Sequence, residues 1–162
     1  GQFLVDVFHE WYAHDVGKIY VSQFDNLLGQ WLGYPSTTCV HQPTCGQSLV
    51  TEANGDVYAC DHFVYPEYKV GNLTQQPLTE IVLSNKQQQF GLEKSQKLTA
   101  LCRRCEFRKL CYGGCPKHRF VSLENEPNPH NYLCASYRYF FEQTAPYMQA
   151  MARQIRLHPS AA

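Results

Sequence analysis

Charged side chains are scarce in this sequence, and neither sign is in excess. Asp, Glu, Lys and Arg make up 17% of the 162 residues, and 14 basic side chains balance 14 acidic ones. A net charge of zero gives no electrostatic footprint for nucleic acid or an anionic membrane, so we expect neither as a partner. No apolar run approaches the ~20 residues of a membrane span, and no signal peptide is evident. We therefore expect a cytoplasmic location.

The sequence does not begin with a methionine, and residues 1–6 already lie within a hydrophobic run. This start predicts that the chain is cut from a longer protein. The 44% of hydrophobic residues suits one domain, or one domain plus a fragment of another.

Hydrophobic periodicity predicts mostly helical structure near the start of the chain. Apolar residues at three- and four-residue steps predict an amphipathic helix over about 2–15, which Gly17 ends. Residues 18–24 are typical of a buried strand, and residues 25–32 of a further short helix. This order is typical of a piece of an α/β barrel, although an ordinary helical cap on the following domain would give the same pattern.

A β-hairpin is predicted where Asn54-Gly55 separates two β-rich runs, 48–51 and 57–61. Both turn residues are expected to adopt positive φ, which places Cys60 on the second strand. Further predicted elements follow along the chain: helices over 78–83 and 85–93, short helices and turns over 101–120, a loop over 125–130, and a helix from 131 that Pro146 interrupts and restarts to about 155.

Eight cysteines carry the chemistry. They form a group of three and a group of five, namely Cys39, Cys45 and Cys60, then Cys102, Cys105, Cys111, Cys115 and Cys134. Tetrahedral thiolate sites need four ligands each, so one cysteine of the second group must serve the first. Cys115 is the natural candidate, because it ends a compact run and precedes a proline, as in two-cluster ferredoxins. The predicted ligand sets are therefore Cys39, Cys45, Cys60 and Cys115 for site I, and Cys102, Cys105, Cys111 and Cys134 for site II.

Three occupants compete for these thiols. Disulfides are disfavoured in a cytoplasmic chain. Two structural zinc ions are a serious alternative, but zinc sites usually pair two C-x2-C units, and only Cys102-x2-Cys105 is present. Iron–sulfur clusters accept ligands at scattered spacings, and basic residues around the second group would stabilise their negative charge. The spacing favours clusters over zinc.

The cysteine pattern resembles the SPASM extension of radical S-adenosylmethionine enzymes. Its spacings match Cys45-x9-Gly55-x4-Cys60, then Cys102-x2-Cys105-x5-Cys111-x3-Cys115, then a final Cys134. Within that superfamily the chain is most similar to the anaerobic sulfatase-maturating enzymes. The segments that carry this closer resemblance are 43–46, 54–63, 111–117 and 131–134, together with Cys39.

The resemblance implies an α+β fold. Residues 1–38 would be the last helix and strand elements of a partial (β/α)6 barrel. Residues 39–135 would be the SPASM auxiliary-cluster domain, a small cysteine-rich domain with a β-hairpin, and residues 136–162 would be C-terminal helices. The chain would be the C-terminal part of the enzyme.

The activity implied by the resemblance is oxidation of a sulfatase Cys or Ser to Cα-formylglycine. A 5′-deoxyadenosyl radical would remove a hydrogen atom from the substrate Cβ, a base would take the proton of the thiol or hydroxyl, and an electron would depart. Asp61, directly after Cys60, occupies the position of the family's proposed base. Without the resemblance, a structural role at the hairpin edge is the better interpretation of Asp61, and His62 is a weaker candidate.

The implied cofactors are two auxiliary [4Fe-4S] clusters in this chain. S-adenosylmethionine and a third [4Fe-4S] cluster would bind in a missing N-terminal part, because no C-x3-C-x2-C motif is present. The fragment alone should therefore be inactive. The implied partners are an unfolded sulfatase polypeptide and an electron donor or acceptor protein such as a flavodoxin or ferredoxin. Two alternatives remain: a SPASM enzyme that modifies another peptide, and a zinc-stabilised protein-binding or regulatory module.

Overall fold

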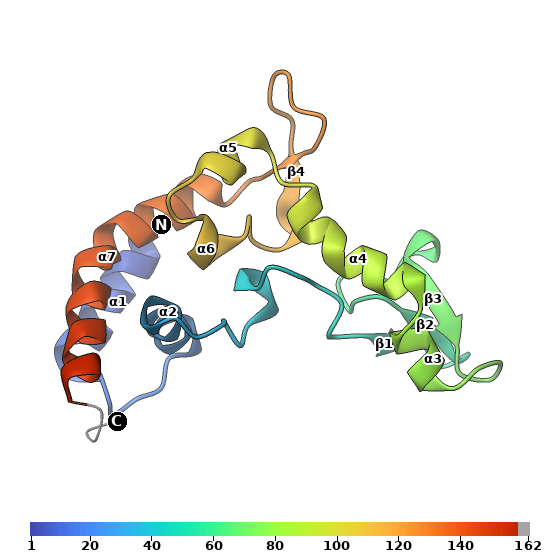
Figure 1. Ribbon diagram of the computed structural model, residues 1–162, viewed down its shortest axis with the longest axis horizontal. Coiled ribbons are helices and arrows are strands. Elements are labelled where there is room, and N and C mark those ends of the chain that lie inside the picture. The colour runs from blue at the N-terminus through green and yellow to red at the C-terminus, as the bar shows by residue number, and fades with distance from the viewer. Residues whose placement is uncertain (159–162) are drawn as a thin grey trace.

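The computed structural model describes residues 1–158 of the chain as a mixture of helices and small antiparallel sheets (Figure 1). The α-helices are α1 (Gln2–His14), α2 (Ser22–Leu32), α3 (Leu78–Val82), α4 (Asn85–Gln96), α5 (Ala100–Arg104), α6 (Arg108–Cys111) and α7 (Cys134–Leu157). The strands are β1 (Val50–Thr51), β2 (Asp56–Tyr58), β3 (Lys69–Asn72), β4 (Arg119–Val121) and β5 (His130–Asn131). Three 3-10 turns complete the order: η1 (Cys39–His41), η2 (Pro66–Tyr68) and η3 (Pro116–His118).

The main hydrophobic core lies between α1, α2 and α7. Phe8 of α1 meets Phe24 of α2 edge to face at 5.4 Å between ring centroids, and it meets Phe140 of α7 at 6.3 Å. Phe107 and Leu110 bring the α6 region into the same core, which places the cysteine-rich segment against α7. Large aromatic side chains dominate such cores because each removes a large apolar area from water. The helical core therefore supports the segment that carries Cys105 and Cys111.

The predicted hairpin is confirmed, with a different turn. Strands β1, β2 and β3 form an antiparallel sheet in that order, with Val50 opposite Tyr58. Of the two turn residues, only Gly55 has a positive φ, at 84°, so the expectation of a positive φ at Asn54 is wrong. Asn54 instead accepts a hydrogen bond from the backbone N–H of Asp56 at 3.0 Å through its side chain. The connection is thus a longer loop that places its glycine in the left-handed position, and Cys60 lies two residues beyond β2.

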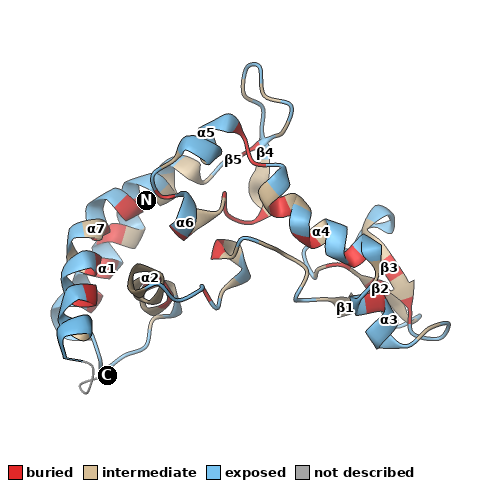
Figure 2. Cartoon of the chain, in the orientation of Figure 1, coloured by how far each residue is buried: buried red, intermediate tan, exposed pale blue. Residues whose placement is uncertain are grey.

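Helix α4 connects the sheet to the rest of the molecule. In Figure 1 it runs from the three-stranded sheet at one end towards the β4 strand and α6 at the centre. The side chain of Ser84 caps its start by accepting the backbone N–H of Gln87 at 3.2 Å. Figure 2 shows buried positions along one side of this helix. They include polar residues, Gln87 and Lys94, which is unusual for a helix interface.

Two predicted elements are wrong. Residues 18–24 form no strand: Ile19 and Tyr20 are exposed, and α2 already begins at Ser22. Trp11 donates its indole N–H to the Ile19 carbonyl at 3.0 Å, which uses a backbone group that a strand would have paired. Pro146 does not divide the last helix either, because α7 continues through it as a single helix. Interior proline removes one backbone hydrogen bond, but Phe140 and Met148, which lie on either side of it, are both buried in the core with α1 and α2.

The remaining helix predictions are confirmed to within a few residues, including α1, α3, α4 and the short helices between 101 and 120. Within residues 1–158, no helix combines the length and the apolar character needed to cross a bilayer. The α+β class is confirmed, whereas the assignment of residues 1–38 to a barrel remains a prediction without its expected strand.

Candidate metal centres

Four cysteines line one cavity of about 560 Å³ beside α7. Cys102 lies in α5, Cys105 follows that helix, Cys111 ends α6, and Cys134 begins α7. Burial raises the pKa of the Cys111 thiol to about 11, and the nearby Cys102 and Cys134 thiols add to this rise. Burial also raises the pKa of Cys134, again with contributions from Cys102 and Cys105. The four thiols predicted as site II therefore face the same space.

The walls of this cavity carry positive charge. Arg104, Arg108 and Arg138 line it together with the four thiols, while Glu106 is the acidic side chain among its lining residues. His130 is nearly buried, with its Nδ1 3.7 Å from the sulfur of Cys102 and 3.0 Å from the Thr99 hydroxyl. Sequence analysis did not single out His130, because its neighbours in space are about 30 residues away along the chain.

The other four cysteines come from three separate segments. Cys39 begins η1, Cys45 lies in the following loop, Cys60 follows β2, and Cys115 directly precedes η3. Burial raises the pKa of the Cys45 thiol, Lys94 opposes this rise, and the Cys115 and Cys39 thiols add to it. Burial likewise raises the pKa of Cys60 to about 12, with a further contribution from Cys115. The sulfur of Cys115 also lies 3.7 Å from Nδ1 of His62, two residues after Cys60, although Cys115 is adjacent in sequence to the later cysteines.

A left-handed turn sends Cys111 and Cys115 in different directions. Tyr112, Gly113 and Gly114 have φ of 47°, 72° and 62°, so three consecutive residues adopt a conformation that side chains disfavour. A Cβ on Gly113 would lie 2.5 Å from Leu98, and one on Gly114 would lie 2.4 Å from the Asn131 side chain. The two glycines are therefore required by both backbone conformation and close packing, and a plain solvent-exposed turn would not require them.

One face of α4 holds the segment that carries Cys39 and Cys45. Gln87 donates to the Gly46 carbonyl at 2.7 Å and to the Ala59 carbonyl at 3.2 Å, so it fixes the backbone next to Cys45 and Cys60. The Cys45 N–H donates to the Gly91 carbonyl at 3.1 Å, and a Cβ on Gly91 would lie 2.7 Å from the Cys45 oxygen.

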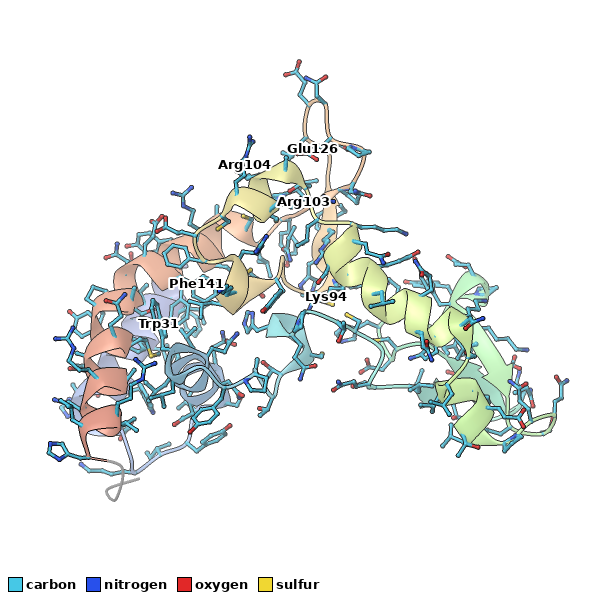
Figure 3. The ribbon with its side chains drawn as sticks, in the orientation of Figure 1. Trp31, Lys94, Arg103, Arg104, Glu126 and Phe141 are labelled. Carbon is cyan, nitrogen blue, oxygen red and sulfur yellow. The ribbon has the colours of Figure 1, made fainter. Side chains whose placement is uncertain are left out.

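Lys94 continues this face one turn further along. Its ammonium group donates to the Cys39 carbonyl at 2.5 Å and to the Val40 carbonyl at 3.0 Å, and the residue is 1% exposed. Figure 3 shows Lys94 on α4 at the centre of the molecule, beside the η1 turn. Sequence analysis missed these residues because polar side chains on a helix ordinarily face water.

Asp61 lies at the surface directly beside the first set of cysteines. Its carboxylate accepts a hydrogen bond from the Cys60 thiol at 3.1 Å, and this bond holds the pKa of Asp61 below its usual value. Asp61 is ionised at neutral pH, as an ordinary aspartate is. The neighbouring His62 is also exposed, and its Nδ1 lies 3.7 Å from the sulfur of Cys115.

All eight cysteines are free thiols. Among residues 1–158, no three Cys, His, Asp or Glu side chains converge closely enough to hold one metal ion. The second set is instead spread around a cavity, and this arrangement of thiols and nearby cations fits an inorganic group larger than a single ion. The assignment of ligands to each site remains a prediction.

Residues 39–106 match the SPASM family, described as an iron-sulfur cluster-binding domain. The chain carries a SPASM domain. The resemblance inferred from the cysteine spacing is therefore confirmed. The match ends before Cys111, Cys115 and Cys134, so the predicted SPASM boundary at residue 135 stays a prediction.

Curated relatives of this SPASM-containing chain carry names from one enzyme family. It is 44% identical over 156 residues to a "Serine-type anaerobic sulfatase-maturating enzyme" of Bacteroides thetaiotaomicron, covering 96% of this chain and 37% of the relative. It is 33% identical over 157 residues to a "Cysteine-type anaerobic sulfatase-maturating enzyme" of Clostridium perfringens, covering 96% of this chain and 42% of the relative. The chain thus spans about two fifths of the length of the relatives it matches.

The fold is also that of solved structures with similar sequences. A structure described as native anSMEcpe with bound AdoMet and Kp18Cys peptide superposes with a TM-score of 0.80 at 34% identity. The match covers 94% of this chain and 42% of that one. A second, described as native anSMEcpe with bound AdoMet, gives a TM-score of 0.79 at 33% identity, with 94% and 42% covered.

Proposed function

We propose that this chain is the auxiliary-cluster part of a radical S-adenosylmethionine enzyme that oxidises a Cys or Ser of a sulfatase to Cα-formylglycine. The observation that supports the proposal is that the sulfur of Cys115 lies 3.7 Å from Nδ1 of His62, two residues after Cys60, in a chain that matches a SPASM domain. The names of the relatives support sulfatase maturation, a similar structure with a bound peptide supports a peptide substrate, and the formylglycine chemistry is what the family resemblance implies.

Two [4Fe-4S] clusters are the proposed occupants of the two sets of thiols. Four thiols around a cavity of about 560 Å³ leave room for a cubane, whereas tetrahedral zinc draws its ligands to ~2.3 Å. Fully ligated clusters of this kind supply electron transfer when bound. The chain's own contribution is to bury the thiols, to place cations beside them and to fix the segments that bear them through α4 and the Cys111–Cys115 turn.

Asp61 is the proposed proton acceptor for the substrate hydroxyl or thiol. As an exposed aspartate it is ionised at neutral pH, and its exposure leaves it accessible to a peptide that approaches the first set of cysteines. Its contact with Cys60 places proton removal next to the proposed route of the departing electron. The alternative role, a structural cap at the end of the hairpin, predicts instead that Asp61 supports cluster retention.

The rest of the proposal concerns the other cofactors, the barrel, the partners and the location. We place S-adenosylmethionine and a third cluster outside this chain, and we assign residues 1–38 to the edge of the barrel that would hold them. The proposed partners are an unfolded sulfatase polypeptide and a flavodoxin- or ferredoxin-like electron carrier. We also propose a cytoplasmic location, because the reducing cytoplasm keeps thiols available as cluster ligands.

Metal analysis is the experiment that tests the proposal. The chain, reconstituted anaerobically with iron and sulfide, is expected to bind about eight iron per molecule and to show brown charge-transfer absorption. Binding of about two zinc with little iron would overturn the proposal and favour the regulatory module. An enzyme that binds iron but leaves both Ser- and Cys-containing sulfatase peptides unmodified, while it oxidises or crosslinks another peptide, would assign the chain to a different SPASM enzyme.

The role of Asp61 needs its own variant. Asp61→Asn in the intact enzyme is expected to retain iron and to lower turnover by about 10²–10⁴-fold. Glu52→Gln, an exposed carboxylate in the same hairpin, is the matched control and should leave turnover unchanged. Loss of iron together with activity in Asp61→Asn would support the structural role instead.

A further inference from the structure

Arg119 is fixed by four hydrogen bonds to backbone carbonyls. Its guanidinium donates to Tyr112 at 3.0 Å, to Gly113 at 3.2 Å and to Gly114 at 3.3 Å, which are the three residues of the left-handed turn. A fourth bond, at 2.7 Å, reaches the Lys94 carbonyl on α4. The rigid fork of an arginine can satisfy several carbonyls at once, and a flexible lysine cannot reproduce this geometry. Arg119 therefore ties the turn between Cys111 and Cys115 to the helix that holds Cys39 and Cys45.

The guanidinium of Arg119 has no acidic partner among the ion pairs of residues 1–158. It is partly buried, and this desolvation lowers its pKa, while four nearby thiols act in the opposite sense. Those thiols are Cys102 and Cys111 from the second set and Cys45 and Cys115 from the first. Burying a cation without a counter-charge is costly, so an anionic group on either side would balance Arg119.

We propose that Arg119 is a positioning residue shared by both cysteine sites: it fixes the turn that joins them, and its charge stabilises the reduced state of the group bound at each. The inference rests on the proposed clusters and adds a residue that the resemblance did not identify. A cluster gains negative charge on reduction, so a fixed cation nearby raises its reduction potential. Because Arg119 is bonded to the turn that joins a proposed ligand of each site, Cys111 and Cys115, one substitution should affect both potentials together.

Two substitutions separate the charge of Arg119 from its hydrogen bonds. Arg119→Gln removes the charge and keeps a shorter amide donor, whereas Arg119→Lys keeps the charge and loses the fork. Arg104→Gln is the matched control, because Arg104 lines the cavity of the second site but is not among the charged neighbours of the first-site thiols.

The measurement is a redox titration of the anaerobically reconstituted chain, followed by electron paramagnetic resonance. Signals are assigned to each site with Cys39→Ser and Cys134→Ser. We expect Arg119→Gln to lower the equilibrium constant for reduction about tenfold at each site, equivalent to ~59 mV for one electron. Arg119→Lys should recover most of this shift, and Arg104→Gln should leave the first-site potential unchanged.

The outcomes that refute the inference differ from those that refute the proposed function. Absence of iron in the unsubstituted chain overturns the proposed clusters, and the inference with them. If the unsubstituted chain binds iron, unchanged potentials or a shift at one site alone in Arg119→Gln overturns the inference and leaves the proposed function intact. Equal loss of iron in the Gln and Lys variants would also overturn it, because Arg119 would then act only as a structural clamp.

Discussion

Lys94→Met tests whether α4 holds the first cysteine segment through a single buried ammonium group. The substitution preserves the length and apolar body of the side chain but removes its charge and its donors. The carbonyls of Cys39 and Val40 would then lose their partners at 2.5 and 3.0 Å. The carbonyl groups belong to the η1 turn, so the turn should loosen before any other part of the first site.

The expected cost of Lys94→Met follows from these two contacts. Hydrogen bonds from a charged donor contribute about 1.5–3 kcal/mol each, which gives about 3–6 kcal/mol for the pair. Burial of the ammonium group, which lowers the pKa of Lys94, offsets part of this gain. We expect a net loss of about 3 kcal/mol in the free energy of unfolding. Lys97→Met is the control, since Lys97 is exposed and contacts Glu93 of the same helix at 2.6 Å, a pair worth about 0.3–0.5 kcal/mol.

Urea-induced unfolding, followed by circular dichroism on the reduced chain at a fixed metal load, measures both variants. Iron content provides a second readout, because Cys39 lies in the η1 turn whose carbonyls accept the hydrogen bonds from Lys94. A Lys94→Met variant within about 0.5 kcal/mol of Lys97→Met, with unchanged iron content, would refute the reasoning. It would show that the free-energy cost of desolvating the ammonium group equals the stabilisation from its two hydrogen bonds.

Three further perturbations have defined outcomes. Gly91→Val should destabilise the chain by about 1–3 kcal/mol in the urea assay, because a Cβ there would lie 2.7 Å from the Cys45 oxygen. Its control, Gly29→Ala, has open space around the new Cβ and should stabilise α2 by about 0.5–1 kcal/mol in the same assay. Pro146→Ala should raise the unfolding free energy by about 2 kcal/mol, since it restores an interior hydrogen bond of α7 on an exposed position; an unchanged or lower thermal midpoint would contradict this. Removal of the bound metal by a chelator should lower the thermal midpoint of unfolding. It should also reduce hydrogen-exchange protection around Cys115 before it reduces protection at Phe140 in the core. An equal loss of protection at both places would argue against local stabilisation by the metal.

The sequence identified the thiols and most helices because both signals are local. Cysteine spacing is independent of side-chain packing, and amphipathic periodicity marked α1 and α7 directly. The strand expected over 18–24 did not form because β-rich composition alone does not supply a partner: these residues pair with no strand of either sheet in residues 1–158, and Ile19 and Tyr20 stay exposed.

The supporting residues could not be predicted in the same way. Gln87 and Lys94 are buried and Arg119 is half-buried, and their side chains donate to carbonyls that lie between 5 and 55 residues away. Nothing in their immediate sequence distinguishes them from solvent-exposed polar residues. Their roles depend on which segment of chain packs across α4, and that is a property of the tertiary structure.

The turn at Tyr112–Gly114 has a consequence for how the protein assembles. If Cys115 serves the first set while Cys111 serves the second, each centre closes a loop of chain that contains part of the other. Closing one loop shortens the conformational search for the second, so loading of either centre should speed loading of the other. Oxidative damage to one centre should likewise loosen the segments that carry the ligands of the other.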